Sequence, residues 1–299
     1  MIIMPGSEKN VTIQPWNDPV FRRAGIRVDV LRLDLLHPEV SGNKWLKLSG
    51  YLQQAKAKNK AGILTKGGPW SNHAHACAYA CKALQLSCTL WIMGHEKKLT
   101  ATIQDCIKWG AAVNFVNRQT FYDELPAVEY ARSHNYLYIA LGGAGKTGIE
   151  GVAGYLEALE LPAYTHAVCA TGTATTLAGL AFTPKNFTHV IGIESGTKDA
   201  TLGETVAGWQ HQLPHKKLAL LHQFSFGGYS KYTGALIDFM NTLSRQHGIP
   251  TDIVYTSKLF YAVRELAGQS HFKPDSRLLV IHSGGLQGNR SLPPAILQF

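Results

Sequence analysis

The stretch His166-Ala-Val-Cys-Ala-Thr-Gly-Thr-Ala-Thr-Thr176 joins a short apolar run to a turn rich in threonine. The run predicts a buried strand, and the threonines predict the start of a helix, because threonine caps helix N-termini. Two more predicted strands end in glycine turns, at Lys66-Gly67-Gly68 and at Ser283-Gly284-Gly285. Ligands of open α/β sheets bind beyond the carboxyl ends of the strands, so we expect the functional site at these turns.

The same alternation of short apolar runs and helical patterns continues along the chain. It is typical of βαβ units and of parallel sheets that are covered on both faces. We therefore predict an α/β, doubly wound fold. The expected strands are Ile63–Thr65, Cys88–Met93, Ala112–Val116, Tyr136–Ala140, His166–Ala170, His189–Glu194, Leu218–Leu221 and Arg277–His282. The expected helices are Asn72–Leu84, Thr100–Trp109, Tyr122–Ser133, Ile149–Leu159, Tyr232–His247 and Ser257–Ala267.

Composition narrows the class of protein. The 299 residues are 45% apolar and 16% charged, which provides a sizeable core for one large domain or two smaller ones. The net charge of +9 favours anionic ligands. Nucleic acid is not the expected partner, because the lysine-rich stretches Lys56-Ala-Lys58-Asn-Lys60 and Lys216-Lys217 are short.

The five cysteines are an odd number in a long chain, which indicates reduced thiols rather than a disulfide framework. The apolar start, Met1 to Met4, stops at Pro5 and is too short for a secretory signal. Nothing approaches 18 uninterrupted apolar residues. We expect a cytoplasmic enzyme that does not span a membrane.

The segment Ala140-Leu-Gly-Gly-Ala-Gly-Lys-Thr147 fits the permissive form of a nucleotide-binding P-loop, in which Lys146 and Thr147 serve the phosphates and Mg²⁺. Its first position is alanine, and the strands His189–Glu194 and Arg277–His282 do not end in the aspartate that holds the metal. We favour a glycine-rich turn between domains. A nucleotide-binding protein is the alternative from another class.

His73, Cys77 and Cys81 are four residues apart and share one helix face, which is a spacing that metal ligands use. Their neighbours are mostly alanine, however, and free cysteine is a common core residue. Packing is the favoured interpretation, so we predict no metal.

Two further segments point to one cofactor. Lys44 follows Gly42-Asn43 at the start of a helix, and a lysine there forms a Schiff base if its amine is deprotonated by burial or by a neighbouring cation such as Lys47. Thr171 to Thr176 offers helix N-terminal amides and several hydroxyls to a phosphate. Taken singly, each segment has a second interpretation: Lys44 as a surface lysine, and the threonine turn as an ordinary helix cap. Together, the two segments suggest pyridoxal 5′-phosphate.

At these residues the chain resembles the 1-aminocyclopropane-1-carboxylate deaminase and D-cysteine desulfhydrase family, pyridoxal-phosphate enzymes of fold type II. The resemblance implies two α/β domains and a homodimer. It places 1–47 and 142–299 in a larger cofactor-binding domain and 48–141 in a smaller one. The blocks that carry it are His37-Pro38, Ser41-Gly42-Asn43-Lys44, Gly67-Gly68, Ser71-Asn72-His73, Gly172–Gly179, Gly227-Gly228-Tyr229, Val254-Tyr255-Thr256-x-Lys258 and His282-Ser283-Gly284-Gly285.

The resemblance also implies roles for individual residues. Lys44 would bind the cofactor covalently and later exchange protons with the substrate. Asn72 would hydrogen-bond the cofactor 3′-oxygen, and Ser71 would meet the substrate carboxylate or take part in proton transfer. Tyr229 and Tyr255 would face the substrate as acids or bases, with pKa values lowered by the cofactor's cation. The phosphate would lie on Gly172, Thr173, Ala174, Thr175 and Thr176.

Thr256 and Ser283 occupy positions where the deaminase branch of the family carries Glu and Leu, and His73 replaces its usual Gln. Because a hydroxyl protonates the pyridine nitrogen only weakly, these residues favour eliminating a good leaving group. The predicted activity is D-cysteine desulfhydrase, which gives pyruvate, sulfide and ammonia. The alternative is the deaminase, which gives 2-oxobutanoate and ammonia. The chain departs from the family pattern in two places. Ala174 and Thr175 stand where many relatives carry glycine, and the segment before Lys44 is short.

Overall fold

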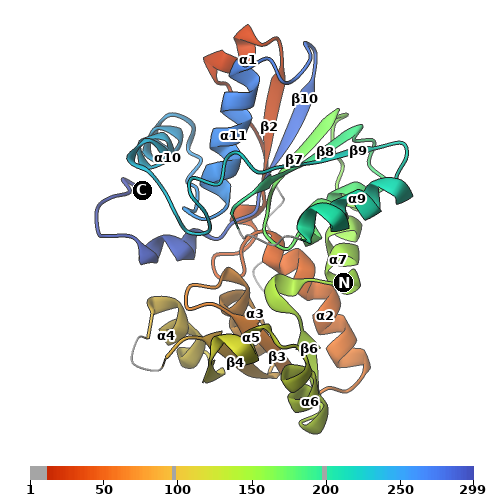
Figure 1. Cartoon of the computed structure of the whole chain (residues 1–299), viewed down its shortest axis with the longest axis vertical. Coiled ribbons are helices and arrows are strands. Elements are labelled where there is room, and N and C mark those ends of the chain that lie inside the picture. Colours follow the sequence, from red (N-terminus) through yellow and green to blue (C-terminus); the bar gives the residue numbers. More distant parts are fainter. Residues whose placement is uncertain (1–11, 96–98, 197–200) are drawn as a thin grey trace.

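The computed structural model describes residues 12–95, 99–196 and 201–299, which form two β-sheets flanked by helices (Figure 1). The larger sheet, uppermost in Figure 1, has the strand order β1-β2-β10-β7-β8-β9, and the smaller has the order β5-β4-β3-β6. Strands of the larger sheet are β1 (Ile13–Pro15), β2 (Arg27–Arg32), β7 (His166–Thr171), β8 (His189–Glu194), β9 (Lys217–Leu221) and β10 (Arg277–His282). Those of the smaller sheet are β3 (Gly62–Gly67), β4 (Ser87–Met93), β5 (Ala112–Val116) and β6 (Tyr136–Ile139).

Strand direction confirms the predicted fold class. In the part of the chain that the structure describes, β1 and β2 form the one antiparallel pair, and the other neighbours run parallel. All eight predicted strands are present. The sequence reading missed β1, which is only three residues long, and β2, in which charged residues interrupt the apolar pattern.

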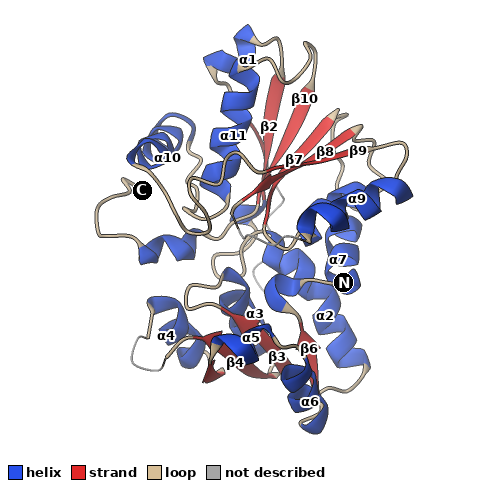
Figure 2. Ribbon diagram, in the orientation of Figure 1, coloured by secondary structure: helices blue, strands red, loops and turns tan. Residues whose placement is uncertain are grey.

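Eleven α-helices lie in the described ranges, and Figure 2 shows them around both sheets. The predicted helix Tyr122–Ser133 is present as α6 but begins at Leu125, because the chain breaks at Asp123 and the new helix carries Pro126 in its first turn. The helices are α1 (Pro19–Arg23), α2 (Asn43–Ala57), α3 (Asn72–Ala83), α4 (Ala101–Lys108), α5 (Arg118–Tyr122), α6 (Leu125–Ser133), α7 (Lys146–Glu157), α8 (Thr175–Phe182), α9 (Leu202–Gln212), α10 (Gly234–His247) and α11 (Thr256–Gly268). Three 3₁₀ segments, η1 (Leu33–Leu35), η2 (Leu141–Gly143) and η3 (Leu286–Ser291), complete the connections.

Both faces of the larger sheet are buried, which is the doubly wound arrangement. Along β7, Val168 and Ala170 join a core with α1 and α11, whereas Ala167 and Cys169 join a core with α7 and α8. This alternation follows from the two-residue side-chain period of a strand. The carboxyl ends of the parallel strands therefore stay free of covering helices, and their turns are available for a site.

The predicted boundary at residue 48 falls inside α2, which runs without interruption from Asn43 to Ala57. Helix α2 packs on α7, so it connects the elements that surround the two sheets. The division into domains of 48–141 and the remainder stays a prediction. No helix in the described ranges is long and apolar enough to cross a membrane.

Candidate active site

Lys44 lies in the first turn of α2, which a glycine turn fixes against the end of β10. Gly42 has φ +70°, and its N–H donates to the carbonyl of Leu33 at 2.9 Å. A Cβ on Gly42 would lie 1.8 Å from the carbonyl oxygen of Ser283. Only glycine allows this approach, so the Gly42-Asn43 turn holds Lys44 beside the carboxyl end of the larger sheet.

The amine of Lys44 is linked to the threonine turn through one side chain. Its Nζ donates to Asn43 Oδ1 at 2.9 Å, and Asn43 Nδ2 donates to Thr176 Oγ1 at 2.8 Å. Burial lowers the pKa of Lys44 to about 8, against the opposing charge of Asp252. With this pKa about a tenth of Lys44 is neutral at pH 7, far more than for an ordinary lysine, and a nucleophilic amine must be neutral.

Lys47 does not act on Lys44 as predicted. Its side chain is buried, its Nζ donates to the carbonyl of Gly142 at 3.3 Å, and burial together with Lys44 holds its pKa well below the usual range. The pKa of Lys44 is lowered by burial itself. Two amines buried so close together cannot both stay charged, and Lys47 is the one more strongly driven to the neutral form.

The threonine turn gathers hydroxyls at the N-terminus of a helix. Ala174 adopts φ +53°, α8 begins at Thr175, and the hydroxyls of Thr173 and Thr175 lie 3.0 Å apart. The α8 amides and the surrounding hydroxyls suit a phosphate, since a helix N-terminus offers unpaired N–H groups. Gly172 lies so close to Tyr255 that a Cβ there would be 3.2 Å from the ring.

Tyr229 and Tyr255, which the resemblance expects to face the substrate, lie with their hydroxyl oxygens 3.4 Å apart. The Nζ of Lys44 lies 5.9 Å from the centre of the Tyr255 ring. Burial raises the pKa of both phenols, and the neighbouring Asp252 raises it further. The lowering of these pKa values by the cofactor's cation stays a prediction.

A buried lysine fixes the loop that carries Tyr229. Lys258 donates through Nζ to the carbonyls of Ser195, Ser225 and Gly228, at 3.0, 2.8 and 2.8 Å. These contacts tie the loop before Tyr229 to the end of β8. The sequence identifies Lys258 only as part of a motif, and its three hydrogen-bond partners lie 30 or more residues away along the chain.

Sequence reasoning missed Asp252, which is 1% exposed. Its carboxylate accepts N–H bonds from Val254, Tyr255 and Thr256, and it also accepts the hydroxyl of Thr256 at 2.7 Å. An aspartate just before a helix is a recognised capping signal, so Asp252 before α11 was detectable as a cap. Its proximity to Lys44 and to both tyrosines was not detectable.

Ser71 and Asn72 begin α3 at the carboxyl edge of the smaller sheet. Ser71 is the N-cap, and its Oγ accepts the N–H of Ala74 at 3.1 Å. Asn72 Oδ1 accepts a hydrogen bond from Gln287, which follows β10 of the larger sheet. This hydrogen bond joins a predicted site residue beside the smaller sheet to the segment that follows the larger sheet's last strand.

The buried turn at Ser283 is held by His282. His282 Nε2 donates to the carbonyl of Pro250 at 2.6 Å, and its Nδ1 accepts the N–H of Gly284 at 3.3 Å. Burial lowers the pKa of His282, which agrees with a neutral ring in this pairing. Beneath it, Arg32 makes a two-point ion pair with Asp34, at 2.9 and 2.7 Å.

His73 does not share a cluster with the cysteines. Its Nε2 lies 3.0 Å from Thr65 Oγ1, whose own proton goes to the carbonyl of Ile139. Its buried Nδ1 has no hydrogen-bond partner among the described residues, and burial with the nearby Lys44 and Lys47 lowers its pKa to about 3. The cysteine that joins Cys77 and Cys81 is instead Cys88, with the three sulfur atoms within 4.8 Å in the core.

The P-loop alternative gains no support from the geometry of 140–147. The side chain of Lys146 is 88% exposed, and its Nζ pairs with Glu150 on the same helix at 3.7 Å. The glycines serve packing instead, because Gly143 lies against the side chains of Lys47 and His73. The segment 140–147 therefore covers one side of the Lys47 side chain.

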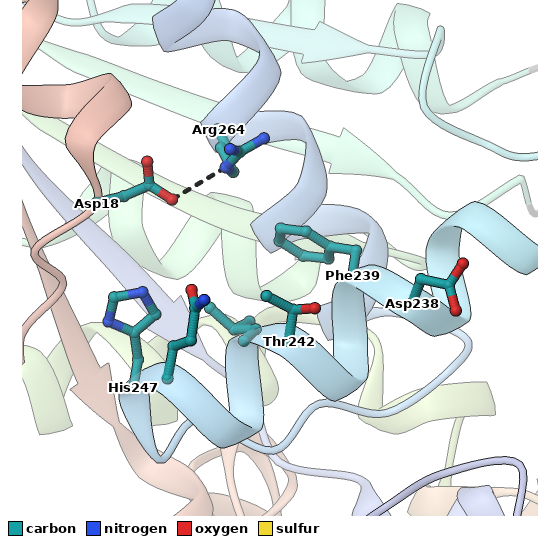
Figure 3. Close-up of a pocket in the computed structure, with 8 residues that line it drawn as sticks. Asp18, Asp238, Phe239, Thr242, His247 and Arg264 are labelled. Carbon is teal, nitrogen blue, oxygen red and sulfur yellow. Dashed lines mark hydrogen bonds and ion pairs between the residues drawn. The ribbon is translucent and has the colours of Figure 1, made fainter.

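Figure 3 shows a separate pocket between α10, α11 and the start of α1. An ion pair between Asp18 and Arg264, at 2.9 Å, lies at one edge. The other lining residues include Asp238, Phe239 and His247. None of the predicted site residues lines this pocket, so it is distinct from the candidate active site.

The model of the family described as "Pyridoxal-phosphate dependent enzyme" matches residues 18–284. The chain belongs to this family. A curated protein of Pyrococcus horikoshii, named "Putative 1-aminocyclopropane-1-carboxylate deaminase", is 29% identical over 93% of this chain and 92% of its own length. The 1-aminocyclopropane-1-carboxylate deaminase of Allorhizobium ampelinum is 24% identical over 82% of each chain. A crystal structure described as an ACC deaminase homologue superposes with a TM-score of 0.81 and 25% identity, covering 96% of this chain and 92% of that one.

The donor set of this pyridoxal-phosphate-dependent enzyme fits its cofactor. The turn at Ala174 supplies amides and hydroxyls for a phosphate, and Lys44 supplies an amine whose pKa is lowered to about 8. Asn72 keeps an amide group free for the ring, and the buried His73 Nδ1 is an unpaired acceptor among the described residues. The family match confirms the predicted cofactor and fold type. The predicted D-cysteine activity is not confirmed, and the named relatives favour the deaminase alternative.

Proposed function

We propose that this enzyme deaminates a small amino acid, with 1-aminocyclopropane-1-carboxylate as the substrate to which its relatives point. Water would be added, and 2-oxobutanoate and ammonia would be released. The observation that carries the proposal is the meeting of Lys44, the threonine turn and the tyrosine pair at the carboxyl ends of the strands. Relatives named for this activity match the chain over most of its length.

Pyridoxal phosphate, when bound, withdraws electrons from the bonds at the substrate α-carbon. The protein's task is to hold it and to move protons. In the proposal the amides of Thr175 and Thr176 bind the phosphate, and Asn72 donates from Nδ2 to the ring oxygen. Lys44 accepts a proton as a neutral amine, because burial keeps its pKa at about 8.

The tyrosine pair and Ser71 would handle the remaining protons. Tyr255 donates its O–H to Tyr229, whose side chain is 49% exposed and reaches solvent. A proton leaving Tyr255 therefore has a route outward. Ser71 presents its hydroxyl at the N-terminus of α3, where the helix dipole favours a substrate carboxylate.

D-cysteine is the second candidate, and Thr256 and Ser283 are the residues that favour it. The structure weakens the reason given for Thr256. Its hydroxyl donates to the buried Asp252 carboxylate at 2.7 Å and accepts the N–H of Asp252 at 2.7 Å, so one lone pair of an oxygen polarised by a negative charge is left. Such an oxygen would stabilise a protonated nitrogen better than an isolated hydroxyl does, which weakens the main argument against the deaminase.

The test is an absorbance spectrum of the reconstituted protein, followed by assays with both substrates. Wild type should show the visible band of bound cofactor, and Lys44→Ala should lose it. Lys146→Ala, an exposed lysine at a helix start, is the matched control and should keep it. We expect 2-oxobutanoate from 1-aminocyclopropane-1-carboxylate. Sulfide from D-cysteine alone would select the second candidate, and a colourless wild type would overturn both.

A further inference from the structure

We propose that Gln287 is a positioning residue that fixes the side-chain amide of Asn72, so that Nδ2 rather than Oδ1 is presented to the cofactor. Gln287 lies in η3, directly after the Ser283-Gly284-Gly285 turn. The inference rests on the proposed function, since it assumes that Asn72 meets the oxygen of the cofactor ring. The observations that carry it are the partners of Gln287.

The orientation of the Gln287 amide is set by two partners that each have a single hydrogen-bonding role. Arg290 Nη2 can only donate, and it donates to Gln287 Oε1 at 3.2 Å. The carbonyl of Trp70 can only accept, and it lies 3.4 Å from Gln287 Nε2. The hydroxyl of Thr102 also donates to Oε1, at 2.6 Å. Reversing the Gln287 amide would break the contacts with Arg290 and Trp70, whereas the Thr102 hydroxyl can accept as well as donate and so does not discriminate.

The fixed Gln287 amide in turn orients Asn72. Because Nε2 of Gln287 donates to Asn72, the atom of Asn72 that faces it must be the acceptor, Oδ1. Nδ2 is then left over and lies on the side of Gly285, where a Cβ would come within 2.4 Å of it. A donor suits a negatively charged ring oxygen, whereas an amide turned the other way would set two acceptors against each other.

The contact also joins parts of the molecule that are far apart in the sequence. Thr102 is fully buried in α4 of the smaller-sheet region, and Gln287 follows the last strand of the larger sheet. Arg290 makes a second link, because its Nη2 donates to Asp105 of α4 at 2.6 Å. The orientation of the Asn72 side chain therefore depends on contacts between α4, beside the smaller sheet, and η3, which follows the larger sheet.

Gln287→Glu is the sharpest test, because a carboxylate keeps the contacts from Thr102 and Arg290 but cannot donate to Asn72. Titrating apoprotein with pyridoxal phosphate and following fluorescence should show a Kd increased about tenfold or more, as for a lost hydrogen bond to a charged group. The pH at which the bound cofactor changes its absorbance should also move. Gln287→Leu, which adds no charge, should also increase the Kd. It provides the test if the Gln287→Glu variant fails to fold.

An Asn72→Ala background separates positioning from charge or general damage. There Gln287→Glu should add no further increase in Kd, since the amide it orients is gone. Gln210→Glu is the matched control, because this amide is bonded to backbone groups around α9 and β9, away from the site. Equal Kd values for wild type and Gln287→Glu, or an equal increase in the Asn72→Ala background, would overturn the inference alone. A wild type that binds no cofactor would overturn the proposed function with it.

Discussion

A single lysine illustrates how position changes chemistry in this enzyme. Lys44 is an ordinary amine in the sequence, but the first turn of α2 surrounds it with a low-dielectric environment and with the positive end of a helix. Burial lowers its pKa from 10.5 to about 8, and Asp252 opposes the shift. The lysine's reactivity is therefore a balance between burial and one carboxylate.

This balance predicts the pH dependence of cofactor capture. The rate at which apoprotein binds pyridoxal phosphate covalently should rise with pH and level off above a midpoint near 8, where Lys44 becomes neutral. Asp252→Asn removes the charge that raises the pKa, so its midpoint should move to lower pH. Stopped-flow absorbance measures both. Asp238→Asn, an exposed carboxylate at the pocket of Figure 3, should not move it. A midpoint near 10.5 in wild type would contradict the assignment.

At the scale of elements, helix starts do most of the positioning. Helices α2, α3, α8 and α11 each begin at the carboxyl edge of a sheet, and each brings a predicted site residue with it. The dipoles of these helices direct positive ends to the same region. Anionic groups such as a phosphate and a substrate carboxylate are therefore favoured there, in agreement with the net charge of +9.

Ser71 has two duties in this scheme, which a variant series separates. As the N-cap of α3 it accepts the N–H of Ala74, so Ser71→Ala should lower the free energy of unfolding by about 1 kcal/mol. Asn117→Ala removes the cap of α5 and should cost a similar amount without reducing turnover. Denaturant unfolding and steady-state kinetics measure the two effects. If Ser71→Ala is less stable but turns over normally, Ser71 is a cap only.

At the scale of the whole molecule, the proposed site would hold the cofactor between the two sheets, since its residues come from both. Asn72 comes from the smaller sheet's side, and the threonine turn comes from the larger. Contacts such as Arg290 with Asp105 hold the two sides together. A cofactor bound here has partners on both sides and binds only the folded chain. The predicted homodimer stays an expectation from the family resemblance.

Cofactor binding should therefore stabilise the entire fold. At a concentration of about 100 times its Kd, a ligand adds about 2.7 kcal/mol, which corresponds to a rise in Tm of about 5 °C in a protein of this size. Thermal unfolding with and without pyridoxal phosphate measures the shift. Pyridoxal without its phosphate should give a smaller rise, because the threonine turn goes unused. An equal rise for both would argue against a phosphate site at Thr173 to Thr176.

Much of the fold was predictable because it depends on local patterns. Apolar runs such as Arg277–His282 identify buried strands, and the turns that follow them lie at one edge of a parallel sheet by geometry alone. The same logic located the threonine turn, whereas Lys44 was proposed from its Gly42-Asn43 segment and the family resemblance. The logic failed at β1 and β2, where the apolar pattern is short or interrupted by charge, and it missed α5 and began α6 three residues early.

Strand periodicity and turn chemistry, which act between near neighbours, thus predicted the fold class, and the family resemblance of the sequence motifs predicted the cofactor and Lys44 as the candidate lysine. Asp252, Lys258 and Gln287 gained their roles only on folding, since their partners lie up to 217 residues away. Burial decided the protonation of Lys44, Lys47 and the tyrosine pair. A pKa depends on the charges and solvent around a group in space, and the tertiary structure alone sets these.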